Sequence, residues 1–456
     1  MRMKRFFSLI LLFCSFSFFL NVSCAKNTEV TIPIAMASDK NYVYPTIVAM
    51  TSILENKNDS THIDFNILVS DDVTDENKDR LRSLGGMYKN SSVKLIEMKD
   101  ELKGSYLCGY PTSTYYRLLL ASLLPQYDKI LYLDGDTFVR HDLKDMYNLD
   151  LGNNYVAGVK DFPGVCCRPD DYAKRLGVES LNQYINAGIL IMNLKKIRED
   201  KIEDKFKNFI PELKDRGLWL PDQDTLNAVC YDKIKHIDLE YNAMQFLSYD
   251  YKKETRLLNC YSAEEMDKAY NDPAIVHFAG GGKPWKNKNI RFYDEWDKYR
   301  KIAEETIYGA PSLANGTYII ESALDNNKVL DIDGAKTNTG ANLQLWDKNY
   351  TNAQKFYVEY IGEGYYTIKA LCSGKYLDVE GAKKDCGTNV WQYDSNGSNA
   401  QKWLIKEAGN GYYHIISKCG GLCLDVSGAK TKNGTNIHIW GFNGTNAQKF
   451  KFLSAS

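Results

Sequence analysis

The sequence has almost no net charge and lacks the cysteine pattern of a zinc site. Its 456 residues carry 57 Lys and Arg against 58 Asp and Glu, which gives a net charge of −1. This balance excludes a general electrostatic affinity for nucleic acid or for an anionic membrane. No CxxC with a matching second pair is present, which argues against structural zinc. Nine cysteines follow Cys24, so at least one stays unpaired within the monomer, while one or two local bridges remain open.

The N-terminus has the features of a targeting segment. Three basic residues stand within the first five positions, and an apolar stretch runs from Phe6 to Val22. This stretch is long for a signal peptide and marginal for a membrane span. Cys24 follows small residues as at a lipoprotein cleavage site, although Asn21 replaces the usual aliphatic residue. We expect residues 1–24 to be a signal peptide or signal anchor. The rest would be exported (secreted, in the cell envelope or in a secretory-pathway lumen) and would touch a membrane only if this segment is retained or lipidated.

Residues 28–308 alternate between strand-like and helix-like segments. Apolar runs predict strands at 30–37, 63–70, 93–98 and 129–133. Helical patterns follow at 42–54, after the start signal at Thr74, and at 114–124. Strands alternating with helices are typical of an α/β domain with a mainly parallel sheet. Ligands of such sheets bind at the carboxyl ends of the strands.

The string LYLDGD at 131–136 puts two carboxylates at such a strand end. Residues i and i+2 of an extended chain point the same way, so Asp134 and Asp136 can converge on one ion. Gly135 between them allows a ligand to approach the backbone closely. Carboxylates and a diphosphate are hard oxygen ligands, which suit Mn²⁺ or Mg²⁺. The alternative is a solvated loop, because Asp-X-Asp alone is a weak motif.

Further strings occur around LYLDGD in a fixed order: YYRLLL at 115–120, INAGILIMNL at 185–194, PDQDTLN at 221–227 and VHFAGGGKPW at 276–285. Together the strings resemble the family 8 glycosyltransferases, retaining sugar-nucleotide enzymes that include lipooligosaccharide galactosyltransferases and glycogenin. The resemblance covers roughly residues 30–300. It implies a GT-A-like, nucleotide-binding α/β fold. It also implies an activity that moves a hexose, galactose or glucose, from a UDP-sugar to a glycan or glycoconjugate acceptor.

The resemblance implies a role for each matching position. The metal ligands would hold Mn²⁺, or Mg²⁺, against the diphosphate, and they are Asp134, Asp136 and His277. The donor-binding residues would be Ala37, Asp39, Asn41, Arg117, Asn186, Ala187, Gly280 and Lys283. The catalytic residues would be Asp161, Asp222 and Gln223. Gln223 would lie near the reacting face of the sugar, where it would stabilise the oxocarbenium-like state or take part more directly.

Each of these side chains also has a purely structural interpretation. His277 could be a core histidine that follows an apolar pair, and Arg117 could pair with a carboxylate on an exposed helix face. Asp222 and Asp224 could cap the helix that begins after Pro221. It is the joint occurrence of the strings, in one order, that favours a site over these alternatives.

A 47-residue period runs through the last third of the chain. An Asp recurs inside LDI or LDV, at Asp331, Asp378 and Asp425. A Gln recurs inside NAQK before an aromatic residue, at Gln354, Gln401 and Gln448. Three copies at a fixed period mark a repeat architecture, and short apolar strands between Gly and Asn turns predict an all-β domain. We place this domain at 315–456, after a linker at 309–314.

The repeated Gln-X-aromatic resembles ricin-type β-trefoil lectins, in which three copies close around a pseudo-threefold axis. The resemblance implies sugar sites built from the repeated Asp, an aromatic fifteen residues later and, in the first repeat, a Gln: Asp331, Gln344, Trp346, Asp378, Tyr393, Asp425 and Trp440. Trp391 and His438 replace that Gln in the other repeats. The family's Asn before the signature Gln is Ala353, Ala400 and Ala447 here, which removes a hydrogen-bond partner. A trefoil kept for structure or protein docking is the alternative.

Two rival functions remain open at this point. A secreted glycoside hydrolase would use a carboxylate pair without metal or UDP, and the loop from His277 to Lys283 argues against it. A non-catalytic carbohydrate-binding protein is the second rival, and the intact metal and sugar-pocket positions argue against that one. The identities of the donor sugar and of the acceptor are not fixed by these motifs, because epimeric sugars differ by one hydroxyl contact.

Overall fold

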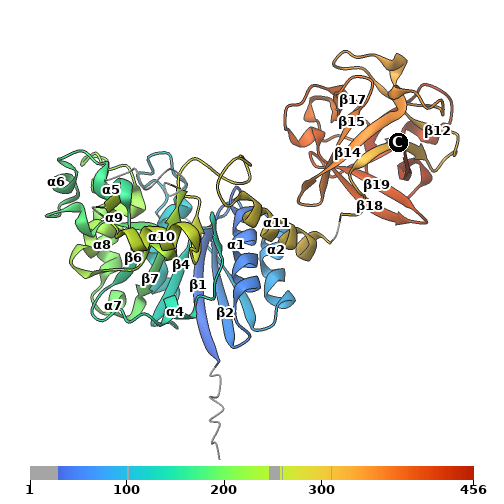
Figure 1. Cartoon of the computed structure of the whole chain (residues 1–456). Coiled ribbons are helices and arrows are strands. Elements are labelled where there is room, and N and C mark those ends of the chain that lie inside the picture. The colour runs from blue at the N-terminus through green and yellow to red at the C-terminus, as the bar shows by residue number, and fades with distance from the viewer. Residues whose placement is uncertain (1–28, 100–101, 246–256, 259, 310, 456) are drawn as a thin grey trace, which may run out of the picture.

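The computed structural model describes residues 29–99, 102–245, 257–258, 260–309 and 311–455. This part of the chain forms an α/β domain, which ends with helix α11 (Tyr293–Tyr308), and an all-β domain, which begins with strand β11 (Gly316–Ser322) (Figure 1). The predicted targeting segment lies outside the described residues. Among those residues, none of the helices has the length and apolar character needed to cross a membrane.

A seven-stranded sheet with the order β3-β2-β1-β4-β7-β6-β8 forms the centre of the α/β domain. The strands are β1 (Val30–Ser38), β2 (Thr61–Val69), β3 (Ser91–Glu97), β4 (Lys129–Leu133), β6 (Val156–Lys160), β7 (Ile185–Asn193) and β8 (Ile234–His236). The pairs β1–β2, β2–β3, β1–β4 and β6–β8 are parallel, and β7 runs antiparallel to β4 and β6. The strands predicted from apolar runs are β1 to β4 of this sheet.

Apolar side chains are buried on both faces of the sheet, as expected where helices cover both faces. Ile34 and Ala35, successive residues of β1, are fully buried in two different clusters. The longest helices are α1 (Val43–Asn56), α2 (Asp75–Met87) and α11, which lie together at one side of the domain (Figure 1). The shorter ones are α3 (Leu120–Leu123), α4 (Lys144–Asn148), α5 (Phe162–Cys166), α6 (Tyr172–Leu176), α7 (Leu194–Glu199), α8 (Ile202–Phe209), α9 (Pro221–Cys230) and α10 (Ala263–Asn271).

One predicted helix differs in form. The segment at 114–124 is a 3₁₀ turn over Thr112–Leu119 that continues into the short helix α3. The residues from Tyr115 to Leu119 are all buried, so this segment packs on all sides and not through one apolar face.

A small second sheet continues the path of the chain beyond β4. It contains β5 (Thr137–Val139), β9 (Ala243–Met244) and β10 (Ile275–His277), with β10 antiparallel to β5 and parallel to β9. In this register His277 lies opposite Thr137, the residue after Asp136. The pairing therefore brings a histidine from the end of the domain's sequence next to the carboxylates that follow β4.

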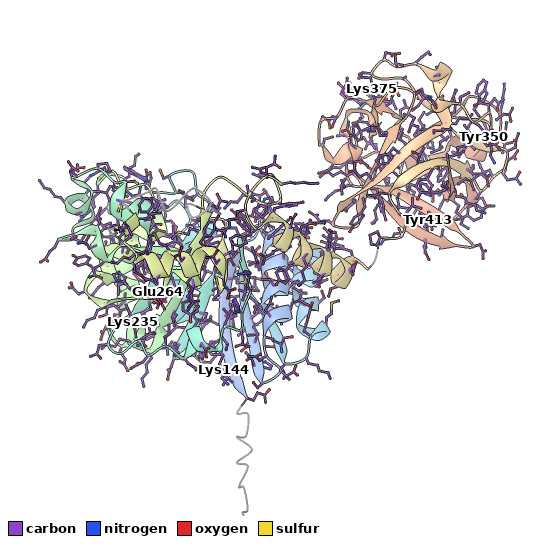
Figure 2. The ribbon with its side chains drawn as sticks, in the orientation of Figure 1. Lys144, Lys235, Glu264, Tyr350, Lys375 and Tyr413 are labelled. Atoms are coloured by element: carbon purple, nitrogen blue, oxygen red, sulfur yellow. The ribbon has the colours of Figure 1, made fainter. Side chains whose placement is uncertain are left out.

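The all-β domain contains twelve strands in one connected sheet. They are β11, β12 (Lys328–Ile332), β13 (Leu343–Asp347), β14 (Lys355–Gly362), β15 (Tyr365–Ala370), β16 (Tyr376–Val379), β17 (Val390–Tyr393), β18 (Trp403–Gly409), β19 (Tyr412–Ser417), β20 (Cys423–Val426), β21 (Thr435–Trp440) and β22 (Phe450–Ser454). Its apolar side chains form one core, whereas Tyr350 on the outer surface is 65% exposed (Figure 2).

Each signature glutamine is buried and closes a loop of its own repeat. Gln354 accepts a hydrogen bond from the backbone N–H of Asn349 at 2.8 Å and donates to the carbonyl of Asp347 at 2.9 Å. Gln401 and Gln448 make the equivalent bonds. The alanines that precede these glutamines are buried in the same core. The Ala and Gln of each NAQK string therefore stabilise the fold, the Ala through core packing and the Gln through hydrogen bonds that close a loop.

No disulfide is formed by the nine cysteines within the described residues. The Sγ atoms of Cys166 and Cys260 lie 3.4 Å apart.

Candidate active site

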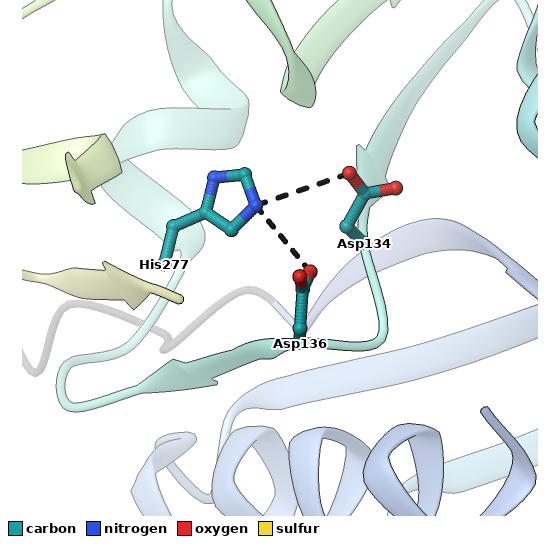
Figure 3. Close-up of side chains that lie close together, drawn as sticks. All are labelled: Asp134, Asp136 and His277. Atoms are coloured by element: carbon teal, nitrogen blue, oxygen red, sulfur yellow. Dashed lines mark ion pairs between the residues drawn. The ribbon is translucent and has the colours of Figure 1, made fainter. Parts of the chain in front are cut away.

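Asp134, Asp136 and His277 each direct one ligand atom to a common point (Figure 3). Nε2 of His277 lies 3.3 Å from Oδ1 of Asp136 and 3.9 Å from Oδ2 of Asp134. The three ligand atoms all lie within 4.8 Å of one another. His277 is 3% exposed, but its ring faces two carboxylates and not an apolar core. This arrangement is what a divalent cation requires of its ligands.

The backbone beside this cluster leaves room for an ion. A Cβ atom on Gly188 of β7 would lie 2.3 Å from Cε1 of His277 and 2.7 Å from Oδ2 of Asp134. Gly135, which lines the cavity, also packs closely, because a Cβ there would lie 2.5 Å from Oγ1 of Thr46. Two carboxylates and one imidazole fit Mn²⁺, whereas Mg²⁺ favours oxygen ligands. The residues present therefore fit the metal that the sequence motifs imply.

Asn242, which is fully buried, orients the histidine. Its Nδ2 donates to Oδ1 of Asn186 at 3.0 Å, and its Oδ1 lies 3.0 Å from Nδ1 of His277. Because this Oδ1 can only accept, the proton of a neutral His277 stands on Nδ1. The lone pair of Nε2 is then free to face Asp134 and Asp136. A partner that fixes the tautomer in this way is usual behind a metal-ligating histidine.

Lys283 adds a cation at the other side of the cluster. Its ammonium forms an ion pair with Asp136 and donates to the carbonyl of Phe278 at 2.7 Å. Burial disfavours ionisation of Asp136, but in the metal-free site a protonated His277 and Lys283 outweigh it and hold the pKa of this carboxyl well below its usual range. Gly280 in the same loop has φ +83°, a conformation that favours glycine. Lys283 and the Gly280 backbone both line the cavity that contains the cluster.

Arg117 links the cluster to the rest of the cavity. It is 5% exposed, and its Nη2 donates to Oδ1 of Asp134 at 2.8 Å. Its Nε lies 3.1 Å from Oδ2 of Asp222. It is therefore part of the site and not a pairing residue on an exposed helix face. Burial raises the pKa of Asp222 to about 6, with Arg117 opposing the rise and Asp134 adding to it.

Gln223 is held at the centre of a buried polar network. Its Oε1 accepts from the backbone N–H of Ala187 at 3.0 Å and from Nδ2 of Asn186 at 3.2 Å. Its Nε2 donates to Oδ2 of Asp161 at 3.2 Å, and the same carboxylate caps α5 through Gly164 at 2.9 Å. Burial raises the pKa of Asp161. The network lines a cavity of about 640 Å³, which is also lined by the metal-ligand cluster of Asp134, Asp136 and His277.

The remaining predicted donor residues are divided between two cavities. Ala37 lines the main cavity, whereas Asp39 and Asn41 line an adjoining one of about 310 Å³. Ser113 lines both. Oδ1 of Asp39 accepts from the backbone N–H of Asn41 at 2.8 Å, so this carboxylate also shapes the turn before α1. The structure thus gathers the predicted metal, donor and catalytic positions around these two cavities.

Asp222 and Asp224, which the sequence suggested as caps of helix α9, have different roles in the structure. The N-cap residue of α9 is Leu220, whose own side chain makes no capping hydrogen bond. Asp224 accepts from the backbone N–H of Leu220 at 2.9 Å and from the hydroxyls of Tyr172 at 2.7 Å and Tyr184 at 2.6 Å, so it has a structural role at the start of this helix. Asp222 instead lines the cavity.

The residues at the site that were not found from the sequence include Tyr42, Tyr110, Arg168 and Asn242. The first three line the main cavity, and Asn242 positions His277. None of them stands in a string with a recognisable spacing. They reach the site through the folding of separate loops, which leaves no local signal.

The all-β domain brings together the predicted lectin positions within each repeat. The Asp of each LDI or LDV string is held by the residue thirteen positions later, in the pairs Gln344–Asp331 at 3.0 Å, Trp391–Asp378 at 3.0 Å and His438–Asp425 at 3.1 Å. One aromatic residue beside each pair is partly exposed: Trp346 at 37%, Tyr393 at 38% and Trp440 at 43%. Each repeat therefore presents an aromatic face next to a carboxylate.

Residues 33–289, more than half of the chain, match the description "Glycosyl transferase family 8", and residues 352–440 match "Ricin-type beta-trefoil lectin domain-like". The chain is 30% identical over 205 residues to general stress protein A of Bacillus subtilis (strain 168), covering 44% of this chain and 69% of that protein. It is 28% identical over 261 residues to a lipopolysaccharide 1,2-glucosyltransferase of Escherichia coli, covering 56% and 73%. The galactosyltransferase LgtC, solved with donor and acceptor sugar analogues, shares the fold with a TM-score of 0.51. The two sequences are 24% identical, and the match covers 59% of this chain and 95% of that chain. These matches confirm the predicted family and the predicted fold class, a GT-A-like domain followed by a β-trefoil.

Proposed function

This chain belongs to glycosyl transferase family 8, and on that premise we propose that it moves a galactose or glucose unit from a UDP-sugar to a glycan or glycoconjugate acceptor with retention of configuration. The observation that carries this proposal is one cavity that contains both a candidate metal-ligand cluster and a buried network of amide and carboxylate side chains. A hydrolase needs no diphosphate-binding cluster, and a pure lectin needs no such network.

The donor would lie across the two adjoining cavities. Ala37, Asp39 and Asn41 would bind the nucleoside, and Lys283 with the Gly280 backbone would contact the diphosphate. Asp134, Asp136 and His277 would hold the divalent cation, Mn²⁺ in preference to Mg²⁺ because of the imidazole. When bound, the cation supplies Lewis-acid compensation for the charge on the departing UDP.

The hexose would occupy the buried network. Asp161, Asn186 and Asp222 offer carboxylate and amide groups that match sugar hydroxyls. In the reaction the bond between the anomeric carbon and the phosphate oxygen breaks, and its electron pair leaves with UDP. An acceptor hydroxyl oxygen forms the new bond on the same face, and its proton passes to the departing diphosphate. The amide oxygen of Gln223 would face the positive charge that develops at the anomeric carbon.

The trefoil would bind acceptor glycan through Asp331, Gln344, Trp346, Asp378, Tyr393, Asp425 and Trp440. Tethering an acceptor in this way raises its effective concentration at the active site, even when each lectin site is weak. We further propose that the protein acts after export, on the strength of the basic and apolar residues at its N-terminus.

Release of UDP by the purified chain tests the proposal. The chain is incubated with a panel of UDP-hexoses in the presence of Mn²⁺, Mg²⁺ or EDTA. We expect Mn²⁺-dependent release from one donor, and loss of this release in Asp136→Asn. The matched control is Asp79→Asn, because Asp79 is an exposed carboxylate on α2 that pairs with Arg82 at 2.8 Å. Release of sugar from a simple glycoside without UDP or metal would instead favour the hydrolase, and no turnover of any donor would contradict the proposal.

A further inference from the structure

A cation on the sugar side of the main cavity has no role in the reaction described above. Arg168 lines this cavity together with Asp161 and Gln223. The centre of its guanidinium lies 4.9 Å from the ring centroid of Tyr172 and 5.0 Å from that of Trp219. Arginine packs in this way on aromatic faces and leaves its edge, which carries the N–H donors, available.

Among the described residues, none pairs with the donors of Arg168. Within the described ranges no carboxylate lies in ion-pair distance of this guanidinium, and its buried Nε has no hydrogen-bond partner. The other cavity arginine differs, because Arg117 contacts both Asp134 and Asp222. A buried donor without a partner costs free energy. A ligand oxyanion would remove this cost through a charge-assisted bond.

The nearby carboxylates are committed elsewhere. Asp161 accepts from Gln223 and from the backbone of Gly164, and Asp224 accepts from two tyrosine hydroxyls and from the backbone of Leu220. The charge of Arg168 acts to lower the pKa of both carboxyls, although neither forms an ion pair with it. The cation is thus placed within the field of the sugar pocket but remains available to a bound molecule.

The charge of Arg168 suits an anionic acceptor better than a neutral hexose donor. The donor pocket presents carboxylates and amides, which suit the hydroxyls of a neutral hexose and would repel an acidic one. Arg168 lines the main cavity together with Tyr110, a residue that is 42% exposed. An exposed aromatic ring beside a cation can support the face of a sugar and bind its acidic substituent.

We propose that Arg168 binds an oxyanion, a carboxylate or a phosphate, carried by the acceptor, so that the enzyme acts on acidic or phosphorylated glycans. This inference rests on the proposed function and names the acceptor class for the same site.

Three small acceptor probes that differ only in the group at C6 test the inference: methyl β-glucoside, methyl β-glucuronide and methyl β-glucoside 6-phosphate. Each is added to the full chain with Mn²⁺ and the UDP-hexose that it turns over. UDP release is followed, and the concentration that gives half of the maximal change in rate is measured. We expect at least one anionic probe to act at a concentration about 10- to 100-fold lower than the neutral probe, the ratio that a charge-assisted hydrogen bond provides. The stronger of the two anionic probes tells a carboxylate from a phosphate.

Variants assign the effect to Arg168. Arg168→Gln brings the ratio between anionic and neutral probes close to one, and Arg168→Lys restores part of it because the charge is kept. The matched control is Arg175→Gln. Arg175 packs over the same Tyr172 and Trp219 rings at 5.0 and 5.5 Å, but it pairs with Asp171 and does not line the cavity. This control should keep the ratio of the wild type.

Several results would overturn the inference. A ratio near one in the wild type, an equal loss in Arg175→Gln, or no effect of any probe would each do so. Arg168-dependent preference for a UDP-uronate over UDP-hexoses would also do so, because the anion would then belong to the donor. Failure of the proposed function would give a different result, because no UDP-hexose would then release UDP even before a probe is added.

Discussion

Nε of Arg117 lies 3.1 Å from Oδ2 of Asp222, yet this ion pair does not fully offset the burial of the carboxylate. The same guanidinium donates to Asp134 at 2.8 Å, so one cation is shared between two carboxylates. Burial raises the pKa of Asp222 to about 6, and the charge of Asp134 contributes to the rise. The site therefore contains a negative charge that the folded chain holds at a cost.

Asp222→Asn should stabilise the metal-free protein in a pH-dependent way. The pKa of Asp222 is higher in the folded state than in the unfolded chain, so the folded state binds more protons between these two values. The contribution of Asp222 to the free energy of unfolding of the wild type therefore falls as pH rises from about 4 to about 6, and it stays low at higher pH. The gain from Asp222→Asn should be ~1–3 kcal/mol larger at pH 7.5 than at pH 4.5. Urea unfolding in EDTA at both pH values measures it.

Asp297→Asn provides a control of opposite sign. Burial disfavours ionisation of Asp297, but Arg300 and Lys301 outweigh it and lower the pKa of this carboxyl. Its charge therefore stabilises the fold at neutral pH, and this contribution is lost as pH falls. Asp297→Asn should cost more stability at pH 7.5 than at pH 4.5. The explanation for Asp222 would be wrong if both variants changed with pH in the same direction.

Gly188→Ala should block the metal site without unfolding the domain. Its new Cβ would meet His277 at 2.3 Å and Asp134 at 2.7 Å, so the two ligands would have to separate. We expect Mn²⁺ affinity, measured by calorimetry with UDP present, to fall at least about tenfold, or ~1.4 kcal/mol. Gly86→Ala on α2 is the control, because a Cβ there meets nothing within 4 Å. Equal Mn²⁺ affinity in both variants would mean that Asp134 and His277 are not metal ligands.

The fold could be predicted from the sequence wherever its signal is local. The apolar run at 129–133 is β4, and the carboxylates directly after it lie at the strand end that the alternation of strands and helices predicts. The 47-residue period similarly gave the repeated loops that Gln354 and its counterparts close. In both cases the residues that determine the structure are close together in the chain.

The rest of the site depends on contacts between distant segments. His277 reaches Asp136 only through the pairing of β10 with β5, and the resemblance, not the spacing, indicated its role. Asn242 contacts Asn186 and His277, which lie far away in sequence, and a lone Asn in a loop has no pattern to reveal it. Gly135 was interpreted as space for a ligand, whereas the structure also requires it for packing against Thr46.

Removal of the exposed trefoil aromatics should weaken glycan binding and leave stability unchanged. Trp346, Tyr393 and Trp440 each stand beside a buried Asp and keep more than a third of their surface exposed. Substitution of one by Ala should lower binding to a surface of immobilised galactosides or glucosides by about tenfold at that site, and substitution of all three should abolish it. Surface plasmon resonance with the full chain measures this.

Tyr350→Ala is the control for this series, because Tyr350 is 65% exposed but stands at no predicted sugar position. It should bind glycans as the wild type does. Unchanged binding in the triple variant would leave the trefoil with a structural or protein-docking role.

The trefoil also meets the catalytic domain through a buried carboxylate. Glu304 of α11 is 3% exposed and accepts from the hydroxyl of Tyr44 on α1 and from Arg300 at 2.7 Å. The turn between β14 and β15 approaches it so closely that a Cβ on Gly362 would lie 2.7 Å from Oε1 of Glu304. The ring of Tyr308, at the end of α11, lies under the guanidinium of Arg80 at 4.8 Å. Of these contacts, the approach of Gly362 to Glu304 is the one that places the trefoil against α11.

Gly362→Ala should therefore loosen the docking of the trefoil. The control is Gly409→Ala at the equivalent bulge of the next repeat, where φ is +84° compared with +96° but a Cβ meets nothing within 4 Å. Both variants carry the strain of a left-handed alanine, about 1–2 kcal/mol, so only the clash with Glu304 distinguishes them. Small-angle X-ray scattering should show a larger radius of gyration for Gly362→Ala alone, and proteolysis at 309–314 should be faster. Equal behaviour of the two variants would mean that Glu304 does not hold the domains together.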